Sequence, residues 1–139
     1  MYFLKTTKSF DSAHFLKGYE GKCSNIHGHR WKVVVEIAHE NLQTEGPKRG
    51  MIIDFDDLKK LVKDICDEFD HCLIYEKDSL KPTTIAALKD EDFRIIEVPF
   101  IPTAENYAKM FFDRIKEAGF PVHRVEVFET PNNVAAYEE

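Results

Sequence analysis

The chain has 139 residues, of which 43% are hydrophobic and 32% are charged, and its formal net charge is -6. This length fits one domain over residues 1–139, which can bury a hydrophobic core without disulfide bonds. The composition gives no sign of disorder. The acidic charge argues against nucleic acid as a partner, because proteins that bind nucleic acid carry a basic surface.

Two strands are predicted in the first forty residues. Residues 2–15 alternate well enough to form a strand, and residues 31–37 alternate between apolar and mostly polar side chains in a second one. The stretch between them, residues 17–25, holds two glycines and has no apolar rhythm. It therefore predicts a loop that joins the two strands.

Two amphipathic helices are predicted in the rest of the chain. Asp54 is a candidate N-cap for the first, whose apolar residues recur at i, i+3 and i+4 as far as Phe69. The second begins at Thr103 and has Gly119 at its C′ position. Residues 76–92 are charged and contain a proline, so we expect mostly loop there, with a short helical stretch.

Further strands are predicted on both sides of the second helix. A short strand over 94–98 precedes it, and strands over 122–129 and 134–137 surround a turn at the end of the chain. This order predicts an α+β fold, in which an antiparallel sheet of about four strands carries both helices on one face. Such a sheet has open edges, which proteins either blunt or pair with another subunit.

The cysteines and the apolar segments indicate a cytoplasmic protein. Three cysteines form no C-x-x-C pair, which favours reduced thiols over a disulfide framework. The first ten residues have no apolar run long enough for a signal peptide, and no other segment is long enough to span a membrane. We therefore expect no membrane partner.

Three histidines carry the strongest chemical signal. His27 and His29 are two residues apart on a predicted strand, so their imidazoles point to one face and can converge on one ion. His14 lies near the end of the preceding strand, and hairpin-like pairing would bring it opposite this pair. Three histidines and an open fourth position are typical of catalytic zinc. The alternative is a chance H-x-H pair, and His39 and His123, which have no such companions, are interpreted as surface or hydrogen-bonded histidines.

Cys23 precedes the H-G-H triplet by four residues in a loop that contains glycine. A nearby cation would favour its thiolate, which can act as a base, and the alternative is a free surface thiol. Asp70 and His71 place a carboxylate beside an imidazole, which is how a catalytic histidine is oriented, although such pairs are common at helix ends. Cys66 fits the core pattern, and Cys72 has no predicted role.

Glu129 ends a predicted strand in which Val125 and Val127 occupy the same face. Its carboxylate would therefore point the way these apolar neighbours point. A buried carboxylate is costly unless another group donates to it, and a ligand with two adjacent N–H groups would do so. The alternative is a strand-end glutamate that reaches solvent.

Six short blocks follow one another along nearly the whole chain. They are F-D-S-A-H at 10–14, C-S-N-I-H-G-H at 23–29, G-M-I-I-D-F at 50–55, D-H at 70–71, P-T-A-E-N at 102–106 and F-E-T-P-N-N at 128–133. Together they resemble the 6-pyruvoyltetrahydropterin synthase and 6-carboxytetrahydropterin synthase family. Any one block would be weak, but all six in this order are highly specific.

The resemblance implies a role for each matched residue and an assembly for the chain. It implies Zn²⁺ ligation by His14, His27 and His29. It implies catalytic roles for Cys23, Asp70 and His71, and pterin binding by Glu129, Thr103 and Glu105. It also implies a tunnelling fold, whose sheets join edge to edge between subunits into a barrel. Family members commonly form a homohexamer of two stacked trimers, with sites between subunits.

The spacing C-x-x-x-H-G-H resembles the bacterial and archaeal carboxy enzymes of queuosine and deazapurine biosynthesis. The implied activity is a zinc-dependent lyase reaction that converts 7,8-dihydroneopterin triphosphate to 6-carboxy-5,6,7,8-tetrahydropterin with release of acetaldehyde and triphosphate. The alternatives are the pyruvoyl reaction on the same substrate and a non-catalytic pterin- or zinc-binding protein. The triphosphate must meet positive charge, for which Lys17, Lys22 and Arg30 are candidates.

Overall fold

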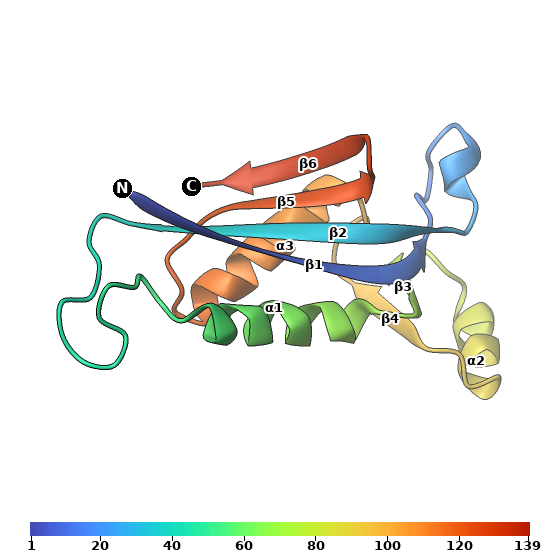
Figure 1. The fold of residues 1–139 in the computed structure, drawn as a ribbon. Coiled ribbons are helices and arrows are strands. Elements are labelled where there is room, and N and C mark those ends of the chain that lie inside the picture. Colours follow the sequence, from blue (N-terminus) through green and yellow to red (C-terminus); the bar gives the residue numbers. More distant parts are fainter.

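Six strands form one sheet, with three helices beside it, in the computed structural model, which describes residues 1–139. The strands are β1 (Tyr2–His14), β2 (His27–His39), β3 (Cys72–Glu76), β4 (Ile95–Val98), β5 (Val122–Thr130) and β6 (Asn133–Glu138). The helices are α1 (Phe55–Phe69), α2 (Pro82–Asp90) and α3 (Ala104–Glu117), and a short 3-10 helix, η1 (Lys22–Ser24), lies between β1 and β2. The helices α1 and α3 pack on one face of the sheet, and α2 lies apart at one end (Figure 1).

The longest pairing in the sheet joins β1 and β2 antiparallel over their whole length. Tyr2 is opposite His39 at one end, and His14 is opposite His27 at the other. Because side chains alternate between the faces of a sheet, one register places Phe10 and Trp31 together on the face that the helices cover. The expected hairpin-like pairing of the two strands is therefore confirmed.

The core lies between the sheet and the helices α1 and α3, as one cluster of 21 buried residues. Strand β2 contributes alternate residues that are fully buried, namely Trp31, Val33, Val35 and Ile37. Helix α1 buries the apolar face that its periodicity predicts, namely Leu58, Val62, Ile65, Cys66 and Phe69. Burying large apolar side chains in this way contributes roughly 1.5–3 kcal/mol for each one. The sheet and both helices are thereby held as one layered unit.

The predicted N-cap of α1 is confirmed, and Thr103, the predicted start of the second helix, is the N-cap of α3. The Asp54 carboxylate accepts a hydrogen bond of 2.9 Å from the backbone N–H of Asp56 at the start of α1. The Thr103 hydroxyl accepts one of 3.3 Å from the N–H of Asn106 and so determines where α3 begins. Gly119 follows α3 with φ of 91°, a left-handed conformation that glycine adopts without strain.

The sheet is larger than predicted, and it is mixed. Its order is β4-β3-β1-β2-β5-β6, and β3 pairs parallel with both β1 and β4. The prediction of about four antiparallel strands was therefore inexact, although the α+β class and the helices on one face are correct. The prediction missed β3 because this five-residue strand follows α1 almost directly, with no glycine or proline to mark the change.

The expectation of mostly loop over residues 76–92 was also inexact, because the short helical stretch expected there is the nine-residue helix α2, which begins at Pro82. Pro82 is the first residue of this helix, where its fixed φ favours helix initiation and its missing N–H costs nothing. No residue of α2 is buried, so the segment has no strong apolar periodicity that would have identified it. No helix of the structure is long and apolar enough to cross a membrane.

Candidate metal centre and substrate pocket

Four side chains that can ligate a metal meet where the β1–β2 ladder ends. The ligand atoms of His14, His27, His29 and Glu129 all lie within 4.8 Å of one another. His14 is opposite His27 in the register, and His29 lies two residues along β2 on the same face. The predicted convergence of the three imidazoles is therefore present in the fold.

Strand β5 brings Glu129 to the three histidines. Phe128 is the partner of Lys32 on β2, so Glu129 lies one residue further along and shares its face with the buried Val127. Its Oε1 atom lies 3.2 Å from Nε2 of His29 and 3.5 Å from Nε2 of His14. The carboxylate therefore points at the imidazoles and not into open solvent, with 31% of the side chain exposed.

Backbone carbonyls orient two of the imidazoles. Nδ1 of His14 lies 2.6 Å from the Pro102 carbonyl, and Nδ1 of His27 lies 2.7 Å from that of Asn25. A carbonyl oxygen only accepts, so each Nδ1 carries the proton and each Nε2 keeps a lone pair. These two Nε2 atoms are 3.1 Å apart and face each other. Such an arrangement is stable when a cation lies between the lone pairs.

The electrostatics of the site favour neutral imidazoles. Burial lowers the pKa of His14 to about 4, the Pro102 carbonyl opposes this, and the neighbouring His27 and His29 lower it further. Burial also lowers the pKa of His29, against the attraction of Glu129. Metal ligands must be deprotonated, so this cluster is prepared to hold a divalent metal at neutral pH. Three imidazoles and one carboxylate form a donor set that suits zinc and similar ions.

A pocket of about 270 Å³ opens beside this cluster. His14 and Glu129 line it together with Thr103 and Glu105, which the N-terminal end of α3 contributes. Asn133 at the start of β6 lies on another wall. All three residues with predicted substrate roles therefore line the pocket beside the metal cluster.

Asp70 and His71 lie in a second cluster, together with Asp11. Nδ1 of His71 lies 2.7 Å from Oδ2 of Asp70, and the other carboxylate oxygen accepts a 2.8 Å hydrogen bond from the backbone N–H of Asp11. That N–H, more than the His71 imidazole, lowers the pKa of Asp70. His71 has φ of 55°, and its side chain is 78% exposed. It lines a different pocket, near Cys72 and Arg94.

Cys23 belongs to neither cluster in the single chain. It lies in η1, is partly buried, and its carbonyl accepts a 2.9 Å hydrogen bond from the N–H of Leu16. The other two thiols are buried, and burial raises the pKa of Cys66 to about 12 and that of Cys72 to about 11. Cys72 is the first residue of β3 and donates to the Phe69 carbonyl at 3.0 Å, which explains a residue that had no predicted role.

The structure distributes the three candidate triphosphate residues over different surfaces. Lys17 lines an open pocket of about 600 Å³ with Lys81 and Lys89, beside the start of α2. Arg30 forms a 3.4 Å ion pair with Asp11, and Lys22 lies in η1. None of the three lines the pocket beside the metal cluster.

Sequence reasoning missed the residues that support the site through their backbone. The Pro102 carbonyl and the Asp11 N–H have no side-chain signature, so no pattern could have identified them. Trp31 is different, because its ring lies 4.9 Å from that of His14 and 5.3 Å from that of His29. Its place two residues after the H-G-H triplet on the same strand face was a usable signal.

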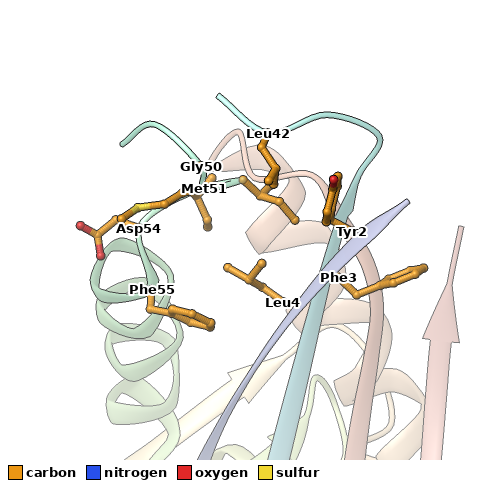
Figure 2. A pocket seen from close by; sticks show the side chains of 10 residues that line it. Tyr2, Phe3, Leu4, Leu42, Gly50, Met51, Asp54 and Phe55 are labelled. Atoms are coloured by element: carbon orange, nitrogen blue, oxygen red, sulfur yellow. The ribbon is translucent and has the colours of Figure 1, made fainter. Parts of the chain in front are cut away.

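An apolar pocket of about 320 Å³ lies at the other end of β1, far along the strand from His14. Figure 2 shows Tyr2, Leu4 and Phe55 around it, with Met51 and Leu42 from the segment before α1. Asp54 is its only carboxylate and serves as the N-cap of α1. This apolar pocket has no histidine and no group of metal-ligating side chains, so we assign the chemistry to the pocket beside His14.

Comparisons with known proteins identify the family of the chain. Residues 3–139 match the family model of 6-pyruvoyl tetrahydropterin synthase. The chain is 40% identical over 134 residues to the 6-carboxy-5,6,7,8-tetrahydropterin synthase of Haemophilus influenzae, covering 94% of each chain. It is 36% identical to the enzyme of the same name from Synechocystis sp., covering 93% of this chain and 87% of the relative.

Solved structures show the same fold. A crystal structure of an uncharacterized protein from Wolinella succinogenes superposes with a TM-score of 0.75 at 24% identity, covering 100% of this chain and 99% of that one. The 6-pyruvoyl tetrahydropterin synthase of Caenorhabditis elegans superposes with a TM-score of 0.69 at 25% identity, covering 99% and 95%. The chain therefore belongs to the 6-pyruvoyl tetrahydropterin synthase family of lyase-type enzymes.

Proposed function

We propose that this chain, as a single domain over residues 1–139, uses zinc to convert 7,8-dihydroneopterin triphosphate and water to 6-carboxy-5,6,7,8-tetrahydropterin, acetaldehyde and triphosphate. The observation that carries the proposal is the convergence of His14, His27 and His29 beside a pocket that Glu129 also lines. A His₃ set is the ligand set of catalytic zinc, which needs a position for substrate. The pocket beside it has room for a small ring system and none for a macromolecule.

The choice of the carboxy product rests on two observations. The chain has three residues between Cys23 and His27, the spacing that distinguishes the carboxy enzymes from the eukaryotic pyruvoyl enzymes. Curated relatives that are 33–40% identical carry the carboxy name. On this basis we propose that the reaction belongs to queuosine and deazapurine biosynthesis. The three cysteines without a C-x-x-C pair favour reduced thiols, so we propose a cytoplasmic enzyme.

The metal and the residues that line the pocket would bind different parts of the substrate. The bound zinc would polarise the side-chain oxygens of the substrate and acidify the neighbouring C–H bonds. Glu129 would accept hydrogen bonds from the ring N–H and the exocyclic amine, which orients the pterin. Thr103 and Glu105 lie on the same wall and would contact the ring from the N-terminal end of α3.

Proton transfer is assigned to Cys23 and to the Asp70–His71 pair. Asp70 stays ionised because the Asp11 N–H lowers its pKa, and it accepts a 2.7 Å hydrogen bond from the Nδ1–H of His71. This leaves Nε2 of an exposed His71 imidazole free to take up or release a proton. Cys23 is the only thiol that is not buried, and it would act as the base nearest the metal.

The site is proposed to be completed between subunits of a homo-oligomer, a hexamer of two trimers. Within one chain, neither Cys23 nor His71 joins the metal cluster, although both are accessible. The strands β4 and β6 are open edges of the sheet, and pairing them with neighbouring copies would close it into a barrel. No nucleic acid or membrane partner is proposed for this acidic chain.

Product analysis tests the function. The zinc-loaded protein is incubated with 7,8-dihydroneopterin triphosphate, and the pterins and the aldehyde are identified by mass spectrometry. We expect 6-carboxytetrahydropterin and acetaldehyde in equal amounts. A pyruvoyl product without acetaldehyde would identify the alternative reaction, and unchanged substrate would indicate a binding protein.

A mixing experiment tests the shared site. Cys23→Ala and His71→Ala are each expected to be inactive as pure oligomers. After subunit exchange, a mixture should regain activity, because some interfaces then carry the intact thiol and the intact imidazole. A mixture that stays inactive, despite exchange shown by native mass spectrometry, would mean that each chain supplies both groups to its own site.

A further inference from the structure

One arginine from another element holds the backbone carbonyls at the C-terminal end of α1. This helix ends at Phe69 without a basic residue in its last turn, and the last carbonyls of a helix have no partner within it. The guanidinium of Arg94, the residue before β4, donates hydrogen bonds to three of them. The acceptors are the carbonyls of Asp67, at 3.2 Å, Glu68 and Asp70. A cation at this end of a helix also offsets the negative pole of the helix dipole.

One of these carbonyls belongs to the peptide group between Asp70 and His71, and this peptide is held on both sides. Arg94 binds its carbonyl oxygen, and its N–H donates a 2.6 Å hydrogen bond to the Asp11 carbonyl. The N–H of Asp11 in turn donates to the Asp70 carboxylate at 2.8 Å. Strand β1 and the residue before β4 therefore fix the orientation of this peptide from two directions.

These hydrogen bonds matter because His71 has a backbone conformation that histidine seldom adopts. Its φ is 55°, in the left-handed region that disfavours residues with a Cβ atom. Turning over the preceding peptide would return φ to the common negative range, but this rotation breaks both hydrogen bonds of the peptide. The same rotation would carry Nδ1 of His71 away from the Asp70 carboxylate, which it contacts at 2.7 Å. Arg94 and Asp11 therefore oppose the loss of that contact.

The position of Arg94 is itself fixed by its neighbours. Its backbone carbonyl accepts a 3.0 Å hydrogen bond from the N–H of Leu73 on β3, the strand that follows His71. The nearby Glu68 carboxylate accepts two hydrogen bonds of 2.6 Å from Arg114 of α3, so it does not draw the Arg94 guanidinium away from the carbonyls. A planar guanidinium can bind several oxygens at once, whereas a lysine ammonium is a compact point charge.

We infer that Arg94 is a positioning residue for the proton-transfer pair, because it keeps the peptide between Asp70 and His71 in the orientation that places the imidazole beside the carboxylate. This inference rests on the proposed function, in which that pair moves protons. Arg94 acts through a peptide group and not on the reacting atoms. Its loss should therefore lower the rate of the chemical step more than it weakens substrate binding.

Steady-state kinetics of the zinc-loaded oligomer test the inference. We expect Arg94→Ala to lower kcat about tenfold to hundredfold, because misplacing a group by about 1 Å can cost about 10²-fold. KM and zinc content should stay near the parent values. Arg94→Lys keeps the charge without the planar donors, so its kcat should fall between the two, and it provides the comparison if Arg94→Ala does not fold.

Arg114→Ala is the matched control. It removes an arginine that also contacts the end of α1, but one that binds only the Glu68 carboxylate and no backbone carbonyl. We expect this variant to keep the parent kcat. An equal loss of kcat in Arg94→Ala and Arg114→Ala would mean that Arg94 acts only through the stability of α1, and parent kcat in both Arg94 variants would overturn its role.

Hydrogen–deuterium exchange of the same proteins reports the peptide without an activity assay. The His71 amide donates to the Asp11 carbonyl, so rotation of the peptide would expose it, and we expect faster exchange at His71 in Arg94→Ala. Amides in the middle of α1, such as those of Leu61 and Val62, should keep the parent rate. Parent exchange at His71, or faster exchange along the whole of α1, would contradict local positioning.

His71→Ala separates this inference from the proposed function. If His71→Ala turns over at the parent rate, the proton-transfer role of the pair is wrong, and the inference fails with it. If His71→Ala is inactive while Arg94→Ala keeps the parent kcat, only the positioning role of Arg94 fails.

Discussion

Nε2 of His14 and Nε2 of His27 lie 3.1 Å apart, although the residues are thirteen positions apart in the chain. Their pairing is the last rung of the β1–β2 ladder, so a long antiparallel register sets the distance between two metal ligands. A slip of one residue would turn one imidazole to the opposite face of the sheet. The stability of this ladder and the geometry of the site are therefore linked.

Single replacement of His14, His27 or His29 by alanine should lower bound zinc and activity together. Each imidazole supplies one bond of a small ligand set, and no spare histidine lies in the cluster. Metal analysis of the purified variants measures the effect. The control is His39→Ala, at the exposed end of β2, which should keep parent zinc content. Full zinc occupancy in all three variants would show that these histidines are not the metal ligands.

Cys23→Ala should abolish or severely reduce turnover while zinc content stays close to that of the parent. The thiol lies outside the cluster of metal ligands, so its loss removes a proton-transfer group and no ligand. Kinetics and metal analysis on the same preparation measure both quantities. Loss of zinc, or turnover at the parent rate, would contradict the role assigned to Cys23.

Alkylation of the native protein should modify Cys23 before the other two cysteines. Burial raises the pKa of Cys66 to about 12 and that of Cys72 to about 11, so both remain protonated thiols at pH 7. Peptide mass spectrometry after brief treatment with iodoacetamide identifies the modified site, and substrate should protect it. Equal labelling of Cys66 would show that the core around α1 opens.

Acid should destabilise the metal-free protein through His14. The pKa of this imidazole is about 4 in the folded chain, against an ordinary value of 6.5 for a solvated histidine, so the unfolded state binds the proton more readily between these values. Stability from this group is complete above pH 6.5 and is lost as pH falls towards 4, in total about 3 kcal/mol. Urea unfolding of chelator-treated protein at pH 7 and pH 5 measures the slope, which should be smaller in His14→Gln.

Tyr107→Phe should leave the free energy of unfolding unchanged or raise it by about 1 kcal/mol. The Tyr107 side chain is fully buried and its hydroxyl has no hydrogen-bond partner, whereas its ring packs edge-on against Trp31 at 4.8 Å. Phenylalanine keeps the ring contact and removes the unpaired hydroxyl. Thermal or urea unfolding tests this, with Tyr107→Ala as the control that should lose roughly 3–5 kcal/mol. A clear loss in Tyr107→Phe would mean that buried water bonds to the hydroxyl.

Local sequence patterns were sufficient for the elements that carry the core. The period of α1, the caps Asp54 and Thr103, and the glycine after α3 each depend on neighbours a few residues away, so they can be read directly from the chain. The H-x-H spacing likewise predicts two imidazoles on one face, because alternation along a strand is a local property. Hairpin-like pairing of the first two strands then predicts His14 as the third metal ligand, because it places this residue opposite His27.

Only the tertiary structure decided which distant segments complete the site and the sheet. Strand β3 pairs parallel with β1 through contacts between residues about sixty positions apart, and no local signal specifies such a partner. Glu129 lies beside the histidines because of the register between β2 and β5 and the register shift between Phe128 and Thr130. Both are set by packing between strands. The Pro102 carbonyl that orients His14 is a backbone group, and every residue in the chain has one. Sequence therefore determined which side chains could ligate a metal, whereas the fold determined which backbone carbonyls orient them and which carboxylate lies beside them.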